Sequence, residues 1–116
     1  MEVIKLIYAY IRVSTKQQNI DRQYVEIKEF GVDDKFIYID KESGKDFDRT
    51  NYKKLIKKLK KDDLLIVKSI DRLGRNYHMI LEEWAHITKT IGADIKVLDM
   101  PLLDTRIEGK NLVGKF

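Results

Sequence analysis

The stretch YIRVST, residues 10–15, is the most informative part of the sequence for the fold. A long apolar run that begins at residue 3 ends there in the cation of Arg12 and the hydroxyl of Ser14. Residues two apart in a strand project to the same face, so Arg12 and Ser14 point together while Ile11 and Val13 face the other way. A guanidinium stays protonated, and its planar fork matches phosphate oxygens. The stretch therefore predicts a buried strand whose end binds a phosphoryl group. Alternatively, Ser14 or Thr15 caps the following helix and Arg12 only reaches the solvent.

Strands and helices alternate along the rest of the chain. Apolar runs predict strands at residues 3–13, 36–40, 64–69 and 95–98, and helical spacing predicts helices at residues 20–30, 52–59 and 77–91. Gly31 and Gly92 are placed to end the first and third helices. Residues 102–116 look like the start of a further helix. Short loops between alternating elements indicate an α/β fold with an open, mostly parallel four-stranded sheet and helices on both faces.

Composition limits the class of protein. With 116 residues, 43% hydrophobic and 36% charged, the chain is one compact domain. It contains no cysteine, which excludes disulfides and a thiol nucleophile. No apolar run approaches the length of a membrane span and no basic leader precedes the first strand, so we expect a cytoplasmic protein with no membrane partner.

The net charge of +4 has the sign expected for nucleic-acid binding. Much of this charge lies in six lysines between residues 53 and 61. That run is either the solvated face of a helix or a surface that attracts phosphates without sequence preference.

Polar residues follow three of the predicted strands at their carboxyl ends, where ligands bind in open parallel sheets. They are Arg12, Ser14, Asp40, Asp71, Arg72 and Arg75. Arg49, in the loop after the second strand, could reach the same edge. If residues 72–75 are helical, Arg72 and Arg75 share a face and Leu73 packs inward. Guanidinium groups gathered in this way repel each other unless an anion lies between them, and the two aspartates supply compensating charge. We expect a phosphodiester at this edge, although separately Asp71 suits a helix N-cap and Arg75 a surface position.

Other catalytic patterns find little support. His78 and His86 are expected to be surface or structural residues, and the sequence has no G-x-S-x-G motif, P-loop or dinucleotide fingerprint. Asp40, Asp71 and Asp99 could hold Mg²⁺, but a metal would be redundant beside so many guanidinium groups. We therefore expect neither a metal nor a cofactor.

The sequence resembles the catalytic domain of the serine recombinases, the family of resolvases and invertases. The resemblance runs from about residue 8 to the end of the chain, and its stretches are YIRVST (10–15), NIDRQ (19–23), DKESG (40–44), DR (48–49) and IDRLGR (70–75). It implies that Ser14 attacks a DNA phosphodiester to give a 5′-phosphoserine and a free 3′-hydroxyl. Strand exchange and religation would follow.

The resemblance also implies roles for individual residues. Arg12, Arg72 and Arg75 would bind the phosphate and stabilise its transition state, with Arg49 contributing from a mobile loop. Two aspartates would orient the arginines, two glutamines would lie beside the nucleophile, and two further residues would support the site; these are Asp71, Asp40, Gln18, Gln23, Tyr10 and Ser43. The groups that move the proton of Ser14 are not identified.

Members of that family usually continue into a long helix that forms the dimer interface and crosses the DNA minor groove, followed by a separate DNA-binding domain. We therefore expect residues 1–116 to be a catalytic domain with that helix truncated and the DNA-binding domain absent. The full-length protein would act on DNA as a homodimer and a synaptic tetramer, and this fragment alone would not recombine a specific site. The sequence does not choose between resolution, inversion, integration and transposition. Two other functions stay open: a Mg²⁺-dependent nuclease or phosphatase, and a non-catalytic regulator that uses the fold to bind partners.

Overall fold

A computed structural model of the chain describes residues 6–14, 20–42 and 49–106. Its centre is a parallel four-stranded sheet with the order β2-β1-β3-β4. The strands are β1 (Ile7–Ser14), β2 (Ile37–Glu42), β3 (Leu64–Val67) and β4 (Asp94–Val97). The predicted α/β fold with a parallel sheet is thus confirmed, and the strand order, which the sequence left open, is now defined.

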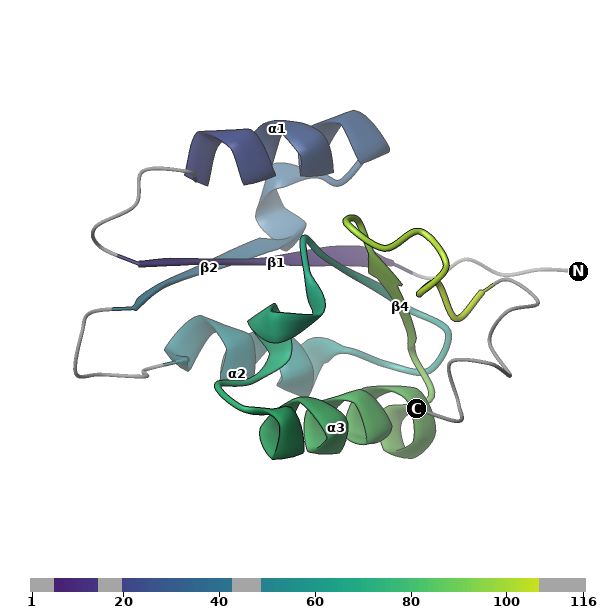
Figure 1. Cartoon of the computed structure of the whole chain (residues 1–116). Helices are drawn as coiled ribbons and strands as arrows, with labels where there is room; N and C mark the ends of the chain where they lie inside the picture. The colour runs from purple at the N-terminus through teal and green to yellow at the C-terminus, as the bar shows by residue number, and fades with distance from the viewer. Residues whose placement is uncertain (1–5, 15–19, 43–48, 107–116) are drawn as a thin grey trace, which may run out of the picture.

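Helices cover both faces of this sheet. The helix α1 (Ile20–Phe30) lies on one face, and α2 (Thr50–Lys58) and α3 (Tyr77–Ala85) lie on the other, as Figure 1 shows. This distribution follows from right-handed crossovers: the chain moves from β1 to β2 in one direction, then from β2 to β3 and β4 in the opposite direction. The reversal of direction places a topological switch point between β1 and β3.

Alternating side chains of β1 divide the interior into two cores. Tyr8 and Tyr10 belong to the core under α2 and α3, whereas Ala9, Ile11 and Val13 belong to the core that contains Ile27 of α1. A central strand covered on both faces is expected to bury all of its side chains, and residues 8–13 are all buried. The alternation predicted from the YIRVST stretch is therefore present through Val13, and the shared face of Arg12 and Ser14 stays a prediction because the side chain of Ser14 is not described.

The first and third helices end at the two glycines predicted to end them, but the third helix is not α-helical throughout. Gly31 and Gly92 have φ values of 112° and 85°, the left-handed conformation in which glycine ends a helix without strain. The predicted helix at residues 77–91 is α-helical only to Ala85 and continues as the π-helical turn η3 (His86–Ile91). Two short 3₁₀ helices, η1 (Asp34–Phe36) and η2 (Ile70–Leu73), were not predicted.

The segment after Pro101 does not begin a helix within the described residues. It turns back along β4, where Asp104 forms an antiparallel bridge with Lys96 and the backbone N–H of Thr105 donates to the carbonyl of Ile95 at 3.0 Å. The apolar residues that suggested a helix, at positions 112–116, lie outside the described part of the chain. The returning segment covers the free edge of β4, which limits pairing with other chains.

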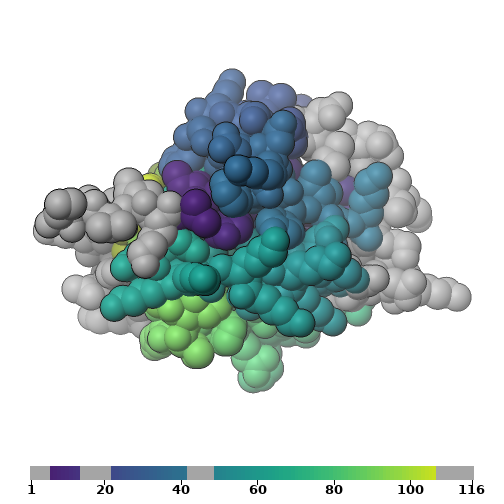
Figure 2. All heavy atoms as spheres, turned by 180° about the vertical axis from the view of Figure 1, so that it is seen from behind, coloured from purple at the N-terminus to yellow at the C-terminus, as the bar shows by residue number. Residues whose placement is uncertain are grey.

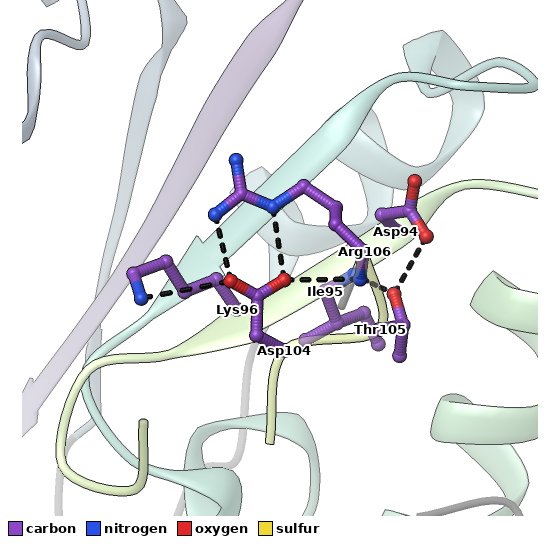
Figure 3. Close-up of polar contacts among 6 residues, drawn as sticks. All are labelled: Asp94, Ile95, Lys96, Asp104, Thr105 and Arg106. Atoms are coloured by element: carbon purple, nitrogen blue, oxygen red, sulfur yellow. Dashed lines mark hydrogen bonds and ion pairs between the residues drawn. The ribbon is translucent and has the colours of Figure 1, made fainter. Parts of the chain in front are cut away.

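Polar contacts hold this returning segment in place (Figure 3). Asp104 accepts hydrogen bonds from Nε and Nη2 of Arg106 at 2.9 and 2.7 Å, and its carboxylate lies 3.7 Å from Nζ of Lys96. The hydrogen bonds from Arg106 lower the pKa of Asp104 below its ordinary value. The hydroxyl of Thr105 links Asp94 to the backbone N–H of Ile95.

Candidate active site at the switch point

The candidate site lies at the carboxyl ends of β1 and β3, on either side of the switch point. Arg12 and Ser14 end β1, and the 3₁₀ helix η2 follows β3 and carries Asp71 and Arg72. On its other side, β1 pairs with β2 in a register that places Arg12 opposite Asp40. Ligands of open parallel sheets bind at such points, because the chain leaves adjacent strands in opposite directions there.

Arg12 connects the two central strands through its side chain. The residue is 8% exposed, and its guanidinium donates from Nη2 to the backbone carbonyl of Asp71 at 2.7 Å. A carbonyl acceptor fixes the position of a guanidinium without cancelling its charge. Arg12 is thus held at the edge of the sheet as a cation, on the face predicted from strand alternation.

Arg49 reaches the same 3₁₀ helix from the other direction. It is the residue before α2 and is 7% exposed, and its Nη1 donates to the carbonyl of Leu73 at 2.6 Å. Its guanidinium carbon lies 3.9 Å from the centre of the Tyr52 ring, a cation–π distance. Two arginines that are 37 positions apart in the sequence are therefore both anchored on the backbone of η2.

Asp40 orients the helix that carries Arg49. Its carboxylate is 6% exposed and accepts from the backbone N–H groups of Asn51 and Tyr52, both at 3.0 Å, and from the hydroxyl of Tyr10 at 2.8 Å. A carboxylate at the first turn of a helix satisfies free N–H groups and is favoured by the helix dipole. These contacts show Asp40 positioning α2, so its influence on Arg49 acts through the helix start.

Burial and the hydrogen bond to Asp40 raise the pKa of Tyr10 far above its ordinary value, so its hydroxyl remains a donor. Tyr10 therefore fixes the carboxylate of Asp40, and its predicted supporting role in the site stays a prediction. Burial similarly raises the pKa of Tyr52, with its hydroxyl donating to Glu83 of α3 at 2.6 Å. The hydroxyl of Tyr52 thus links α2 to α3, and the hydroxyl of Tyr10 holds the carboxylate that binds the start of α2.

The residues of η2 differ from the predicted arrangement. Leu73 is fully buried as expected, but the helix ends there and Gly74 is extended, so Arg72 and Arg75 do not share a helical face. Arg72 lies 3.8 Å from the carboxylate of Asp71, and Arg75 is exposed in the loop before α3. Asp71 acts through its backbone carbonyl on Arg12 and through its carboxylate on Arg72, and it is not the N-cap of η2, which is Ser69.

Gly74 is required by close packing. A Cβ atom at this position would lie 2.8 Å from Cβ of Met79 and 2.9 Å from the backbone nitrogen of Ile80. The loop that carries Arg75 therefore lies directly against the start of α3.

Nε of Arg72 and Oε1 of Gln23 are buried polar atoms that have no hydrogen-bond partner among the described residues. A buried guanidinium N–H without an acceptor is rare unless a ligand or water supplies one. Gln23 is 4% exposed and lies one turn from Ile27, on the α1 side of the sheet. Its predicted place beside the nucleophile stays a prediction.

Three predicted site residues are not placed by the structure. Gln18 and Ser43 lie outside the described residues, and for Ser14 only the backbone is described, as the last residue of β1 in register with Glu42. The predicted mobility of the loop before Arg49 is likewise untested.

Tyr52 is the contributor that the sequence did not assign to the site. It is the first residue of the helix predicted at residues 52–59. Its ring packs in the core and also contacts the guanidinium of Arg49. The available signal was an aromatic residue three positions after an arginine at the start of a helix.

Within the described residues, no three His, Asp or Glu side chains are grouped so that they could hold a metal ion. His78 and His86 are exposed, and His78 lies 3.3 Å from Glu82 on the surface of α3. None of the helices in this part of the chain is long and apolar enough to cross a membrane.

The fold and this edge define a class of protein: an α/β domain with a cationic site at the switch point of a parallel sheet. Comparison with known proteins agrees. Residues 7–115 match the family model described as "Resolvase, N terminal domain". The chain therefore belongs to the resolvase N-terminal domain family.

Several relatives support this assignment. The chain is similar to the Tn3 transposon resolvase of Escherichia coli, with 43% identity over 70 residues that cover 60% of this chain and 38% of the relative. It is similar to a resolvase of Clostridium perfringens strain 13, with 34% identity over 111 residues that cover 96% of this chain and 57% of the relative. The matched part thus spans only about half the length of such relatives. The fold is shared with the N-terminal catalytic domain of TP901-1 integrase, with a TM-score of 0.73, 24% identity and coverage of 94% of this chain and 88% of that one.

Proposed function

We propose that this chain is the catalytic domain of a serine-type, site-specific DNA recombinase. In this reaction the Oγ of Ser14 bonds to the phosphorus of a DNA phosphodiester and the bond from phosphorus to O3′ breaks. The products are a 5′-phosphoserine and a 3′-hydroxyl, the latter carrying the proton that the serine gives up. Religation is the reverse attack by a 3′-hydroxyl after strand exchange.

The observation that carries this proposal is the anchoring of Arg12 and Arg49 on the backbone of η2, beside Arg72, at the edge where Ser14 ends β1. Charge develops on phosphate oxygens in the transition state, and preorganised guanidinium groups stabilise it without rearranging. Nε of Arg72, which has no acceptor among the described residues, is a donor that a phosphate oxygen would satisfy.

Family membership supports the same reaction. The named relatives are resolvases, and a DNA-invertase of phage P7 is also similar, with 36% identity over 77 residues. We propose DNA as the substrate, with no metal or cofactor required, and a cytoplasmic location. We further propose that the full-length protein forms a homodimer and a synaptic tetramer, and that residues 1–116 alone do not recombine a specific site.

Covalent capture tests the proposal. The chain is tethered through its C-terminus to a DNA-binding domain of known specificity and incubated with supercoiled plasmids that carry that domain's site beside randomised sequence. We expect a protein–DNA adduct that resists denaturation and leaves a free 3′-hydroxyl. Ser14→Ala should abolish it, and the matched control Thr15→Ala should retain it.

The same assay separates the competing functions. A chelator should leave adduct formation unchanged, whereas a Mg²⁺-dependent nuclease or phosphatase would lose activity and form no adduct. A regulator without catalysis would bind the plasmid and leave it intact. Either of these results would overturn the proposal.

A further inference from the structure

The net positive charge of this chain is concentrated on α2 and the turn that follows it, and α2 begins directly after Arg49 of the candidate site. Residues 50–61 contain six lysines and no acidic residue, so this segment carries +6. The other 104 residues contain 17 basic and 19 acidic side chains and carry −2. The net charge of +4 therefore depends entirely on α2 and the turn that follows it.

These lysines form one exposed surface, which we call the α2 lysine surface. Its members are Lys53, Lys54, Lys57, Lys58, Lys60 and Lys61, and all six are exposed. In a helix, positions 53, 54, 57 and 58 occupy one continuous arc, opposite the buried Tyr52 and Leu55. Figure 2 shows the teal atoms of this part of the chain spread across one face of the molecule.

The α2 lysine surface has no ion pair among the described residues, in contrast to three lysines elsewhere in the described part of the chain. Lys28 pairs with Asp34, Lys68 with Glu26 and Asp99, and Lys96 with Asp104. Four like charges on α2 and two more in the turn that follows it repel each other, and a polyanion would relieve that repulsion.

The surface is connected to the candidate site at one end and opens into a groove at the other. The N–H groups that begin α2 are held by Asp40, beside Arg49. Lys57, Lys58 and Lys60 line an open groove of about 590 Å³ near the start of β1. Because an α-helix rises about 1.5 Å per residue, Lys58 lies roughly 12 Å along the helix axis from Thr50, where α2 begins beside the site.

We propose that the α2 lysine surface binds the phosphate backbone of duplex DNA, outside the position where the scissile phosphate is held. The inference rests on the proposed function for the identity of the polyanion. Among the exposed large hydrophobic residues of the described structure, none lies in α2, and only Leu6, which is 42% exposed, lines the groove beside Lys57 and Lys58. A protein interface or a membrane surface requires more exposed apolar area than this one side chain provides. Protein–DNA interfaces are, by comparison, polar and strongly positive. The lysines act without sequence preference and hold the DNA flank while the arginines hold the reacting phosphate.

Salt dependence of binding tests this inference. Binding of a labelled 25-base-pair duplex of arbitrary sequence is measured by fluorescence anisotropy between about 50 and 200 mM salt, for the 116-residue chain and for the triple variant Lys53→Gln, Lys54→Gln and Lys57→Gln. Each lost phosphate contact reduces the slope of log K against log salt by about 0.9, so the triple variant should lose up to about 2.7. Glutamine keeps the helix propensity, and circular dichroism checks the fold.

A matched control distinguishes the effect of where the lysines lie from the effect of the total charge of the chain. The variant Lys28→Gln, Lys35→Gln and Lys89→Gln removes the same charge elsewhere and should change the slope by less than about 1. Equal slope changes in the two variants, or no duplex binding by the unaltered chain at 50 mM salt, would overturn the inference. So would lysine-dependent binding to anionic vesicles or lysine-dependent self-association in place of DNA binding.

Failure of the lysine inference can be distinguished from failure of the proposed function. If the Ser14 adduct forms but the α2 variant keeps its slope, only the lysine inference fails. If the slope changes but no adduct forms, the chain binds DNA and the proposed reaction fails.

Discussion

The guanidinium of Arg12 donates a 2.7 Å hydrogen bond to the backbone carbonyl of Asp71, 59 residues further along the chain. This contact joins the end of β1 to the 3₁₀ helix that follows β3, across the switch point of the sheet. It places a cation beside the end of the strand that carries Ser14. The site is therefore built by long-range contacts to the backbone of η2.

Replacing Arg12 by lysine should separate charge from geometry. Lysine keeps the positive charge but lacks the fork that can bind both a carbonyl and a phosphate. We expect Arg12→Lys to slow adduct formation by about 10²-fold, the order found when one transition-state donor is lost, with DNA affinity changed little. Single-turnover rates and anisotropy measure the two effects, and an unchanged rate would show that Arg12 has no part in the chemistry.

The ring of Tyr52 should matter more than its hydroxyl for the reaction. Tyr52→Phe keeps the aromatic face under Arg49 and loses only the bond to Glu83, whereas Tyr52→Leu removes the face. A cation–π contact contributes about 1 kcal/mol or more when buried, so Tyr52→Leu should be about tenfold slower in adduct formation than Tyr52→Phe. Chemical denaturation of both variants controls for stability; equal rates would exclude the supporting role of the ring.

Tyr10 should make the fold sensitive to alkaline pH. Its pKa is raised in the folded state, so its contribution to stability is complete below the ordinary value of 10.0 and declines as the pH rises above it. Tyr10→Phe should lower the free energy of unfolding at pH 7 by about 1 kcal/mol, through loss of the bond to Asp40. The difference from the unaltered chain should shrink between about pH 10 and 12, measured by urea unfolding. A difference that grows there would contradict the assignment.

Asp104 should make the free energy of unfolding sensitive to acidic pH. Its pKa is lowered in the folded state, so its contribution is present above the ordinary value of 3.8 and is lost as the pH falls further. We expect Asp104→Asn to cost about 1–3 kcal/mol at pH 7, because Arg106 and Lys96 lose their charged partner. That cost should decrease below about pH 4, and His78→Gln, on the exposed surface of α3, serves as a neutral control.

Local patterns in the sequence predict most of the fold. The alternation around Arg12, the helical spacing in residues 20–30 and the glycines at 31 and 92 each reflect short-range rules, and the structure follows them. The convergence of polar residues at one edge follows from parallel strands alone. Placing Asp40 and Arg49 near Arg12 required no knowledge of the strand order.

Contacts between distant segments could not be predicted. The sequence of residues 102–106 does not indicate that this segment returns along β4, because the return depends on a tertiary contact between Asp104 and Lys96. The separation of Arg75 from Arg72 depends on the extended Gly74, which is set by packing against Met79. The use of backbone carbonyls rather than carboxylates to anchor Arg12 and Arg49 is also invisible in a sequence, since every residue has a carbonyl.

Peptide mapping of the covalent adduct tests the central claim most directly. After nuclease treatment, trypsin should release the peptide VSTK, residues 13–16, because it follows Arg12 and ends in Lys16. Fragmentation in the mass spectrometer then locates the added phosphate. We expect a phosphate on Ser14, attached through the 5′ side of the cleaved strand. A phosphate on Thr15, or on a peptide from elsewhere in the chain, would contradict it.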